Sequence, residues 1–589
     1  MTITKLQKNE ITQNVIFCIL MAFTFFLSLW KCFYGFQECD EPFYFTIANR
    51  LIQGDTFFKD EWHLSQLSAV LRVPFIFLYK LFHGSTEGIL LAMRITYLCL
   101  RTVMGTWIYF RLRKYRYAAV IAVTLYYLFE LYPLCTFSYN ATAMDSLLVA
   151  GIFLATEEQK RKLPLMITGI FLSFSVLSCP YVAIIYIFYV LTVLFRIFWH
   201  KLFGEKGKNT VIFTYLFEVN TFLWITVGIV LCAFAFLLFV FSRTDIENIV
   251  RNFPSVLFGD PEHIQSSFIK KIIDYFLAIL FCCGYIYFCF FAYFITVVAM
   301  LLDKKRKCHR SIYFSVSTVI AIVSFLLMYS HLIEMYFTAV MFPVMFVGFT
   351  AYLLCEHQPK PLFYCVFIPG IIYSFCVHFS SNQLYTVIFM AMAVSNIACI
   401  IFIFVFLQEL KSEKENQSSS FKKIHQKVCQ FLFILELSMQ ILFLLAIKVY
   451  HLPYGNNMKN MICQIEQGPA KGIFTSKNNL ESYNCFYDRL SYYQNKTPDR
   501  IVITDIRTWG YLYLDQFPCG SYSSWASGIK ESSYQRLKDY YALNPENKAK
   551  YIYLPEESVS VLGINDIYTE SARYGYSVEK QDGIYYLEK

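Results

Sequence analysis

Long apolar runs alternate with short polar segments as far as about residue 450. Each run comes near the roughly 20 residues that a helix needs to cross a bilayer core of about 30 Å. The alternation predicts about 13 spans, near 14–36, 88–110, 117–135, 141–157, 163–178, 181–199, 212–241, 272–302, 311–330, 335–354, 362–378, 384–408 and 428–449. The break at Cys179-Pro180 leaves open whether the fifth and sixth runs are two helices or one kinked helix.

The polar segment 37–87, which follows the first run, contains an amphipathic pattern of its own. Apolar side chains recur at helical spacing from Phe43 to Leu51, and Gly54 is a suitable helix stop. The pattern therefore predicts a helix that lies on the membrane surface with Asp40 and Glu41 at its head.

Two more polar or interfacial segments are expected to face the same side. Residues 67–82 are apolar but contain Arg72, Pro74 and Lys80, and they are too short to span comfortably. We expect them to form a helix in the interface. Residues 242–270 separate the seventh and eighth runs and are long enough to carry functional side chains.

After residue 450 the chain becomes polar and rich in tyrosine. Segments 500–504 and 550–554 are predicted strands, 530–541 is a predicted helix, and Asp582-Gly583 is the predicted turn of a terminal hairpin. About 130 residues are enough to bury a small core, so the tail predicts an α/β domain.

Three further features of the tail carry weaker predictions. Two of the thiols Cys463, Cys485 and Cys519 are able to pair, although the sequence does not say which. The segment Gly468–Gly472 is predicted to be a turn, since it lacks the spacing of a phosphate loop. The alternating aromatics of Trp509–Tyr513 are more typical of one face of a strand than of a sugar-stacking platform.

Loop charge predicts the orientation of the spans. Lysine and arginine gather in every second loop, at 111–116, 160–162, 201–208, 304–310 and 411–427, whereas the short loops near 136–140, 331–334 and 379–383 contain neither. The positive-inside rule then places the N-terminus in the cytoplasm, and an odd number of spans places the C-terminal domain outside.

Composition agrees with a membrane protein and excludes several other classes. The chain is 57% hydrophobic and only 16% charged, whereas soluble domains run nearer 25% charged. Orientation accounts for the net charge of +9, so it does not indicate a nucleic-acid partner. Most cysteines lie inside apolar runs and show no zinc-ligand spacing.

Acidic residues beside a bilayer are functional candidates because a carboxylate is costly to hold near hydrocarbon. The pair Asp40 and Glu41 is the strongest candidate, against the simpler interpretation that one acid caps the helix. Asp145, next to Tyr139 and Asn140, has two equal interpretations, a site residue or a charge at a helix start that Asn140 caps.

Weaker candidates complete the set. Glu61 and His63 have a spacing that suits a divalent metal, but solvated loop charge explains them better. His331 and Glu334 flank the outer end of the tenth run. Cations near outer span ends that are able to bind a phosphate are Arg94, Arg243, Arg251, His263 and Lys270, and for each the simpler interpretation is an interfacial cation.

Several of these segments carry a family resemblance. Asp40-Glu41-x-x-Tyr44 is followed by Gly54-Asp55 and a proline-containing interfacial helix, and the second span opens with Ala92-Met93-Arg94-Ile95. Together with Met144-Asp145, these residues resemble the membrane glycosyltransferases of GT-C fold, in particular the branch of protein O-mannosyltransferases and bacterial aminoarabinose transferases. The family's Lys-Pro-Pro segment is absent, with Val73-Pro74 in its approximate place.

The resemblance implies a donor with a polyprenyl-phosphate tail in the bilayer and an acceptor on the outer side. An acceptor hydroxyl is a poor nucleophile and needs a carboxylate as general base, which we assign to Asp40, with Glu41 orienting the site. Arg94 and a cation of 242–270 would bind the donor phosphate, and Tyr44, Tyr139, Asn140, Asp145, His331 and Glu334 would line the substrate pocket.

The sequence thus predicts an all-α polytopic membrane protein, similar to GT-C enzymes, with a small extracytoplasmic α/β domain. Residues 1–449 would form the glycosyltransferase domain of a bacterial plasma-membrane protein, and 450–589 the outer domain. Its partners would be a polyprenyl-phosphate sugar, an outer acceptor and membrane lipid, and a divalent metal is allowed but not required. The alternatives are a transporter or flippase of lipid-linked saccharides, which would show inverted repeats and mid-membrane polar groups, and a ligand sensor.

Overall fold

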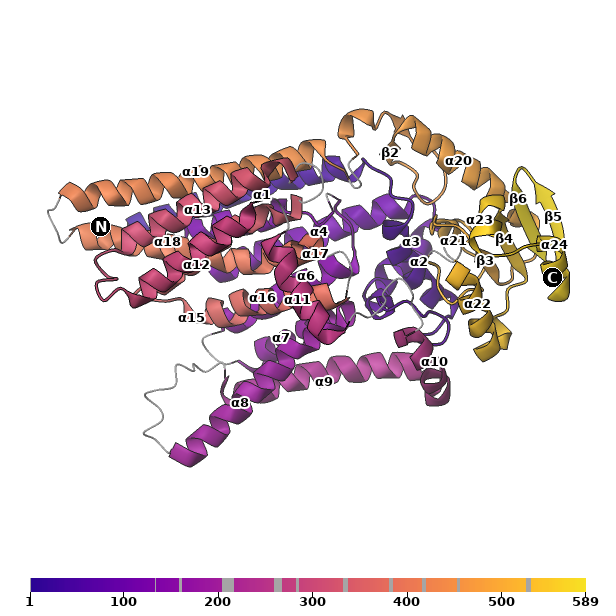
Figure 1. The fold of residues 1–589 in the computed structure, drawn as a ribbon, viewed down its shortest axis with the longest axis horizontal. Coiled ribbons are helices and arrows are strands. Elements are labelled where there is room, and N and C mark those ends of the chain that lie inside the picture. The colour runs from indigo at the N-terminus through magenta and orange to yellow at the C-terminus, as the bar shows by residue number, and fades with distance from the viewer. Residues whose placement is uncertain are drawn as a thin grey trace.

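The computed structural model describes residues 2–132, 134–157, 161–203, 217–258, 267–281, 285–331, 337–380, 385–415, 420–452, 456–525 and 531–589. The chain is mostly helical, with a small mixed sheet near its C-terminus. Figure 1 shows a helical bundle with the N-terminus at its left end and the sheet beyond its right end.

Most of the residues in the predicted apolar runs are helical where the structure describes them. They form α1 (Thr2–Cys32), α4 (Ile89–Leu112), α5 (Tyr117–Leu128), α6 (Tyr139–Thr156), α7 (Lys162–Ser178), α8 (Ala183–Phe203), α9 (Val219–Phe241), α11 (Phe268–Leu280), α12 (Ile286–Leu302), α13 (Arg310–His331), α14 (Pro343–Leu354), α15 (Lys360–Leu362), α16 (Ile368–Ser380), α17 (Tyr385–Ala391), α18 (Ala393–Glu415) and α19 (Ser420–Tyr450). In the described part of the chain, 8 helices are long and apolar enough to cross a membrane. The protein is therefore an integral membrane protein with multiple spans.

Two predicted spans differ from the structure. The run 272–302 is not one helix, because α11 ends at Leu280 and α12 begins at Ile286. The run 117–135 is helical only to Leu128, where the backbone turns extended at Phe129. At Cys179-Pro180 the chain leaves α7 and passes through a 3₁₀ turn, Pro180–Val182, before α8. The proline has no N–H to donate, so the helix ends there.

Small residues bring several spans unusually close together. A Cβ on Gly169 of α7 would lie 2.1 Å from the Ile225 carbonyl oxygen of α9, and one on Gly228 would lie 2.0 Å from that of Met166. Gly151 makes a similar approach to Cys365. Close backbone contact of this kind is how helices associate where no hydrophobic effect drives them together.

The segment 37–87 forms two short helices and a 3₁₀ turn between the bundle and the C-terminal region (Figure 1). They are α2 (Asp40–Gln53), the 3₁₀ turn Gln66–Leu71 and α3 (Val73–His83). The predicted stop of α2 is confirmed, since Gly54 takes the left-handed conformation at its C-terminus. The apolar face of α3 is exposed at Phe77, Leu81 and Phe82, as expected of an interfacial helix.

One prediction for this segment is wrong. The helix was expected to be amphipathic, with one face on lipid, but residues Glu41 to Leu51 of α2 are all buried within the protein. The C-terminal region covers it, with hydrogen bonds from the side chains of Thr46 and Asn49 to Thr508 and Asp515.

The tail has the elements that its sequence predicts. Strands β3 (Ile501–Ile503), β4 (Tyr551–Pro555), β5 (Ser577–Gln581) and β6 (Ile584–Glu588) form a sheet of order β3-β4-β6-β5, in which only β3 and β4 run parallel. Asp582 and Gly583, both with positive φ, turn the hairpin as predicted. Helices α20 (Lys477–Ser491), α21 (Gly510–Tyr513), α22 (Glu531–Leu543), α23 (Glu556–Val561) and α24 (Ile567–Arg573) complete the region, with a small pair of strands β1 (Cys463–Gln464) and β2 (Phe474–Thr475).

Two predictions for the tail are corrected and one is confirmed. Trp509–Tyr513 is not a strand, because Gly510–Tyr513 is the helical turn α21 and Trp509 is a buried ring stacked 4.1 Å from Tyr483. Cys463, Cys485 and Cys519 are free thiols rather than disulfide partners. The Gly468–Gly472 turn is present, and the Gly468 carbonyl accepts a hydrogen bond from the Gly88 N–H before α4.

The helix α10 (Ile246–Phe258) lies in the predicted polar segment 242–270 and contacts the tail near the end of α22 (Figure 1). Asn252 and Asn544 exchange side-chain hydrogen bonds of 3.3 and 2.7 Å. Val256 packs into a small cluster with Trp62 and Tyr540. Segment 37–87, α10 and the tail thus meet in one packed region at the end of the bundle.

Candidate functional site

The predicted acidic pair stands in the first turn of α2, where the helix dipole favours negative charge. Neither acid caps the helix, since Cys39 is the N-cap residue and makes no side-chain capping bond. Glu41 is buried, whereas Asp40 is half-buried. The two neighbouring carboxylates therefore have different environments, and only Asp40 retains access to solvent.

Glu41 and Arg94 form a fully buried ion pair between α2 and α4. Arg94 Nε donates to Glu41 Oε1 at 2.7 Å and Nη2 donates to Oε2 at 2.5 Å. The remaining N–H groups donate to the carbonyls of Cys32, Tyr34 and Gly35 at the end of α1. All five guanidinium donors are thus occupied. The assignment of Arg94 to a donor phosphate does not fit this geometry, and its role here is to hold α1, α2 and α4 together.

Asp40 lies near Tyr139, the first residue of α6, and near Tyr44 of its own helix α2. The rings of Tyr44 and Tyr139 meet edge to face with centroids 5.4 Å apart, and Asp40 interacts electrostatically with Tyr139. From the tail, Thr508 Oγ1 donates to the Cys39 carbonyl at 2.7 Å. The sequence-predicted residues Asp40, Tyr44 and Tyr139 are therefore brought together.

Arg72 completes this group, and the sequence reasoning did not select it. Its three nitrogens donate to the carbonyls of Tyr44 and Phe137 and to the hydroxyl of Ser68, and its guanidinium lies 5.8 Å from the Tyr44 ring centroid. Burial lowers the pKa of Arg72 to about 10. Within the described part of the chain no carboxylate pairs with it. An arginine within the mostly apolar segment 67–82 was the signal available.

Asp145 lies deeper and is not a surface charge at a helix start. It accepts hydrogen bonds from the hydroxyls of Tyr97 and Tyr126, at 2.8 and 2.6 Å, and Arg101 Nε lies 4.0 Å away. Arg101 stands in the middle of α4, so this buried group sits well inside the span. The sequence reasoning overlooked Arg101, although it interrupts an apolar run.

Asn140 does not cap α6 either. Ser138 is the N-cap and accepts from the Ala141 N–H at 3.1 Å. The Asn140 side-chain amide instead donates to the Tyr132 hydroxyl at 3.5 Å. The Asn140 backbone carbonyl accepts a hydrogen bond from the Tyr373 hydroxyl. Asn140 therefore packs at the head of α6 on the side of α16.

The remaining predicted cations do not gather at Asp40. Arg243 donates to the Leu51 carbonyl, near the opposite end of α2 and about 16 Å along the helix from Asp40. Arg251 bonds to Asn248 within its own helix, and Lys270 is exposed at the start of α11. His263 and Glu334 lie outside the described residues, as does the side chain of His331.

Glu61 is not a solvated loop charge, and His63 beside it is half-buried. Glu61 is buried and accepts from Arg50 Nη1 at 2.7 Å and from the His63 N–H at 3.0 Å. His63 Nδ1 bonds to Ser65. Among the described residues, no three His, Cys, Asp or Glu side chains come together as a metal site.

Arg50 organises a buried network that joins segment 37–87 to the tail. It pairs with Asp55 at 2.7 Å and with Glu61, and its Nη2 donates to the Ser521 carbonyl of the tail at 3.3 Å. Asp60 accepts a 2.6 Å bond from Asn547. Burial raises the pKa of both Asp55 and Glu61.

This network predicts an unusual pH dependence. A carboxyl whose pKa is higher in the folded state contributes more stability as the pH falls toward that pKa, and the contribution is lost as the pH rises above it. We therefore expect docking of the tail to be at least as stable at pH 5 as at pH 7. Hydrogen exchange at β3 and α22 at both pH values, corrected for intrinsic rates, measures this. Faster opening at pH 5 in the wild type, but not in Asp55→Asn, would contradict it.

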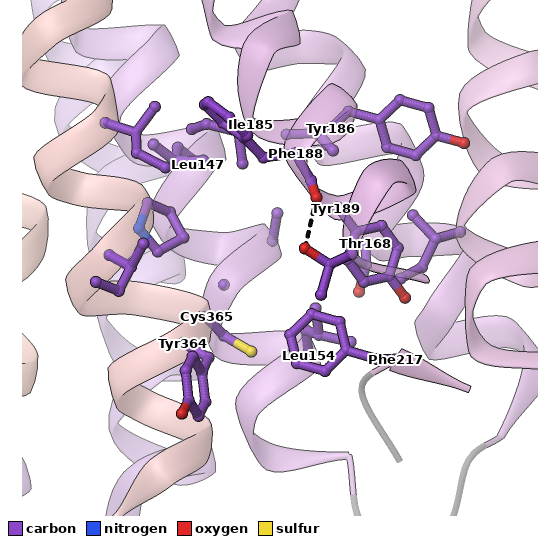
Figure 2. A pocket seen from close by; sticks show the side chains of 18 residues that line it. Leu147, Leu154, Thr168, Ile185, Tyr186, Phe188, Tyr189, Phe217, Tyr364 and Cys365 are labelled. Carbon is purple, nitrogen blue, oxygen red and sulfur yellow. Dashed lines mark hydrogen bonds between the residues drawn. The ribbon is translucent and has the colours of Figure 1, made fainter. Parts of the chain in front are cut away.

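An apolar groove of about 300 Å³ opens between α6, α7, α8, α9 and α16 (Figure 2). Leu147 and Ile185 lie at the top of the view, and Tyr364 and Phe217 lie at the bottom. Leu147 is eight residues from Tyr139 on α6, which corresponds to about 12 Å. The groove therefore begins about two turns further along α6 from Tyr139, which lies in the group around Asp40.

Comparisons with known proteins give only a distant structural likeness. No protein-family model matches the chain, and no curated protein matches its sequence. The oligosaccharyltransferase of Archaeoglobus fulgidus in its apo form is 12% identical, with a TM-score of 0.46 over 92% of this chain and 70% of that chain. The same enzyme tethered to an acceptor peptide with an NVT sequon is 11% identical, with a TM-score of 0.39 over 97% and 74%. At this level of similarity, neither a family nor a function follows for this chain.

Proposed function

We propose that this protein is a glycosyltransferase that moves a sugar from a polyprenyl-phosphate donor to a hydroxyl-bearing acceptor at the outer face of the membrane. The observation that carries the proposal is the position of Asp40. It is held at the head of α2 by the Glu41–Arg94 pair and stands above an apolar groove in the spanning helices.

The prenyl chain and the phosphate of the donor would occupy two different places. Its prenyl chain would occupy the groove, where apolar walls replace lipid. Its phosphate would lie near Arg72, which uses three of its five N–H donors and has no carboxylate partner among the described residues. Arginine suits a phosphate because its planar fork donates bidentately.

The positions of Asp40 and Arg72 assign each of them a role in the reaction. Asp40 takes the proton of the acceptor hydroxyl while the acceptor oxygen bonds to the anomeric carbon. The bond between that carbon and the phosphate oxygen breaks, and prenyl phosphate leaves with the electron pair. Arg72 stabilises the charge that develops on the phosphate. The N-terminus would lie in the cytoplasm and the tail outside, as loop charge predicts.

A transfer assay tests the function and the groove together. Wild-type protein in lipid vesicles is given a panel of prenyl-phosphate sugars and matched short-chain analogues, and we expect transfer from long-chain donors. Ile185→Trp, which fills the groove, should raise the KM for long-chain donors, whereas Ile187→Trp, exposed on the same helix, should not. Absence of transfer from every donor would refute the enzyme.

Arg72→Gln tests whether this arginine contacts the donor phosphate. Loss of a cation that touches the phosphate in both ground and transition states should lower kcat/KM by about ten- to a hundredfold, from the 1.5–3 kcal/mol of a charged hydrogen bond. Steady-state kinetics against donor concentration measure this. Lys80→Gln, at the far end of α3, is the control. Equal kinetics for Arg72→Gln and wild type would exclude Arg72 from the phosphate site.

A specific observation supports transport as the second candidate. The Arg101–Asp145 group lies inside the spans, and α11 and α12 are two short helices in place of one long one. Polar groups and interrupted helices at membrane depth are typical of transporters. A fluorescent lipid-linked saccharide that crosses vesicles only when the protein is present, and more slowly with Asp145→Asn, would favour this alternative.

A further inference from the structure

The C-terminal region contains a chamber that the proposed transfer does not use. Two adjoining cavities, of about 430 and 400 Å³, lie between α22, β4 and α24 and share Tyr534, Lys538 and Glu570. The cavity of about 430 Å³, here called the inner cavity, has an apolar floor that includes Leu537, Ile552, Leu554, Leu562, Ile567 and Leu587. Its volume is that of a small-molecule site rather than of a packing defect.

One buried polar group at the chamber lacks a hydrogen-bond partner. Ser571 is only 4% exposed and lines the inner cavity, yet its hydroxyl has no hydrogen-bond partner in the described structure. A buried hydroxyl without a partner is unfavourable, so a ligand group that bonds to Ser571 would stabilise this region.

Two lysines also line the inner cavity. Lys538 and Lys548 lie over the rings of Tyr534 and Tyr574, with Nζ 4.5 and 5.4 Å from the centroids. Among the described residues, neither amine forms an ion pair with a carboxylate. Burial, and repulsion from the neighbouring Lys589, lower the pKa of Lys548, so a bound anion would stabilise its charged form.

The acidic residues at the rim are already engaged. Glu570 accepts from the Tyr534 hydroxyl, and Asp566 caps α24 by accepting from the Tyr568 N–H at 3.0 Å. Both carboxylates keep their charge, but Asp566 lines only the 400 Å³ cavity. The charged side chains that line the inner cavity are therefore Lys538, Lys548 and Glu570, with a net positive charge, and the rest of its lining is mostly apolar.

We propose that this chamber binds an anionic amphiphile, with its apolar chain in the inner cavity and its carboxylate or phosphate between Lys538 and Lys548 near Ser571. A saccharide fits less well, because the floor offers few partners for its hydroxyl groups. Charge complementarity selects the head group, and the apolar floor selects the chain. The proposal does not depend on the glycosyltransferase activity.

Photolabelling of the full chain in lipid nanodiscs tests the site. The probes are dodecanoate, dodecyl phosphate and dodecanol, each with the same photoreactive group in the chain, and peptide mapping locates the label. We expect both anions to label peptides of 531–589 and dodecanol to label them at least about tenfold less, since one charged hydrogen bond is worth that factor. The ratio of the two anions distinguishes a fatty acid from a lipid phosphate.

Matched variants separate the site from general hydrophobic binding. Leu562→Trp fills the inner cavity and should abolish labelling, whereas Val561→Trp, on the neighbouring exposed residue, should not. If Leu562→Trp fails to fold, Lys538→Gln with Lys548→Gln, both at half-buried positions, still tests the head group and should reduce anion labelling about tenfold. Equal labelling by dodecanol, labelling that survives both lysine changes, or capture of sugar phosphates without a chain would overturn the proposal.

Discussion

Asp40→Asn is expected to lower the rate of sugar transfer by roughly 10²–10⁴-fold, which is the usual contribution of a general base. Asparagine keeps the shape of the side chain but cannot accept the acceptor's proton at neutral pH. Because Asp40 is half-buried at the head of α2 and does not pair with Arg94, its replacement should leave the fold and the donor affinity unchanged. Single-turnover transfer at saturating donor, together with donor binding, measures both quantities.

The control for this variant is a carboxylate that lies beside the opposite end of the same helix. Asp515 pairs with Lys80 at 2.6 Å and accepts from Asn49 of α2. Asp515→Asn therefore perturbs the packing of α2 without touching its head, and we expect transfer within about threefold of wild type, from the small worth of a partly exposed pair. Transfer by Asp40→Asn at the wild-type rate would rule out Asp40 as the base.

Breaking the Glu41–Arg94 pair should have the largest effect on stability. Glu41→Gln leaves the Arg94 charge buried without its counter-ion, and Arg94→Met leaves the Glu41 carboxylate in the same position, with both side chains fully buried in the wild type. Removing one partner of such a pair costs about 3–5 kcal/mol. We expect each single variant to lower the Tm in detergent markedly and to loosen the junction of α1, α2 and α4.

The double variant Glu41→Gln with Arg94→Met distinguishes charge from packing. With both charges removed, we expect a substantial part of the lost stability to return, because apolar or neutral replacements of a buried ion pair are often tolerated. Lys496→Gln is the surface control, since its pair with Glu588 at 2.6 Å is partly exposed and should contribute at most about 1 kcal/mol. Single variants as stable as the wild type would show that the pair does not hold the junction.

Features that depend on residues close in sequence were predictable. The apolar runs identified the spanning helices, because each backbone must satisfy its own hydrogen bonds within hydrocarbon. The helix from Asp40 to Gln53, its stop at Gly54 and the hairpin at Asp582-Gly583 follow from local periodicity and from residues that accept positive φ. The position of Asp40 at the end of the first span needed no tertiary information.

Features that depend on which distant residues meet were not predictable. Arg94 was expected to face a phosphate, but Glu41, 53 positions away in the chain, occupies it. Asp145 was ambiguous until Tyr97, Tyr126 and Arg101 were found around it, and Trp509–Tyr513 has an alternation that suits a strand although it folds as a helical turn. In each case the partner of a buried polar or aromatic group comes from another helix, so burial and pairing energies, which local patterns do not encode, set its role.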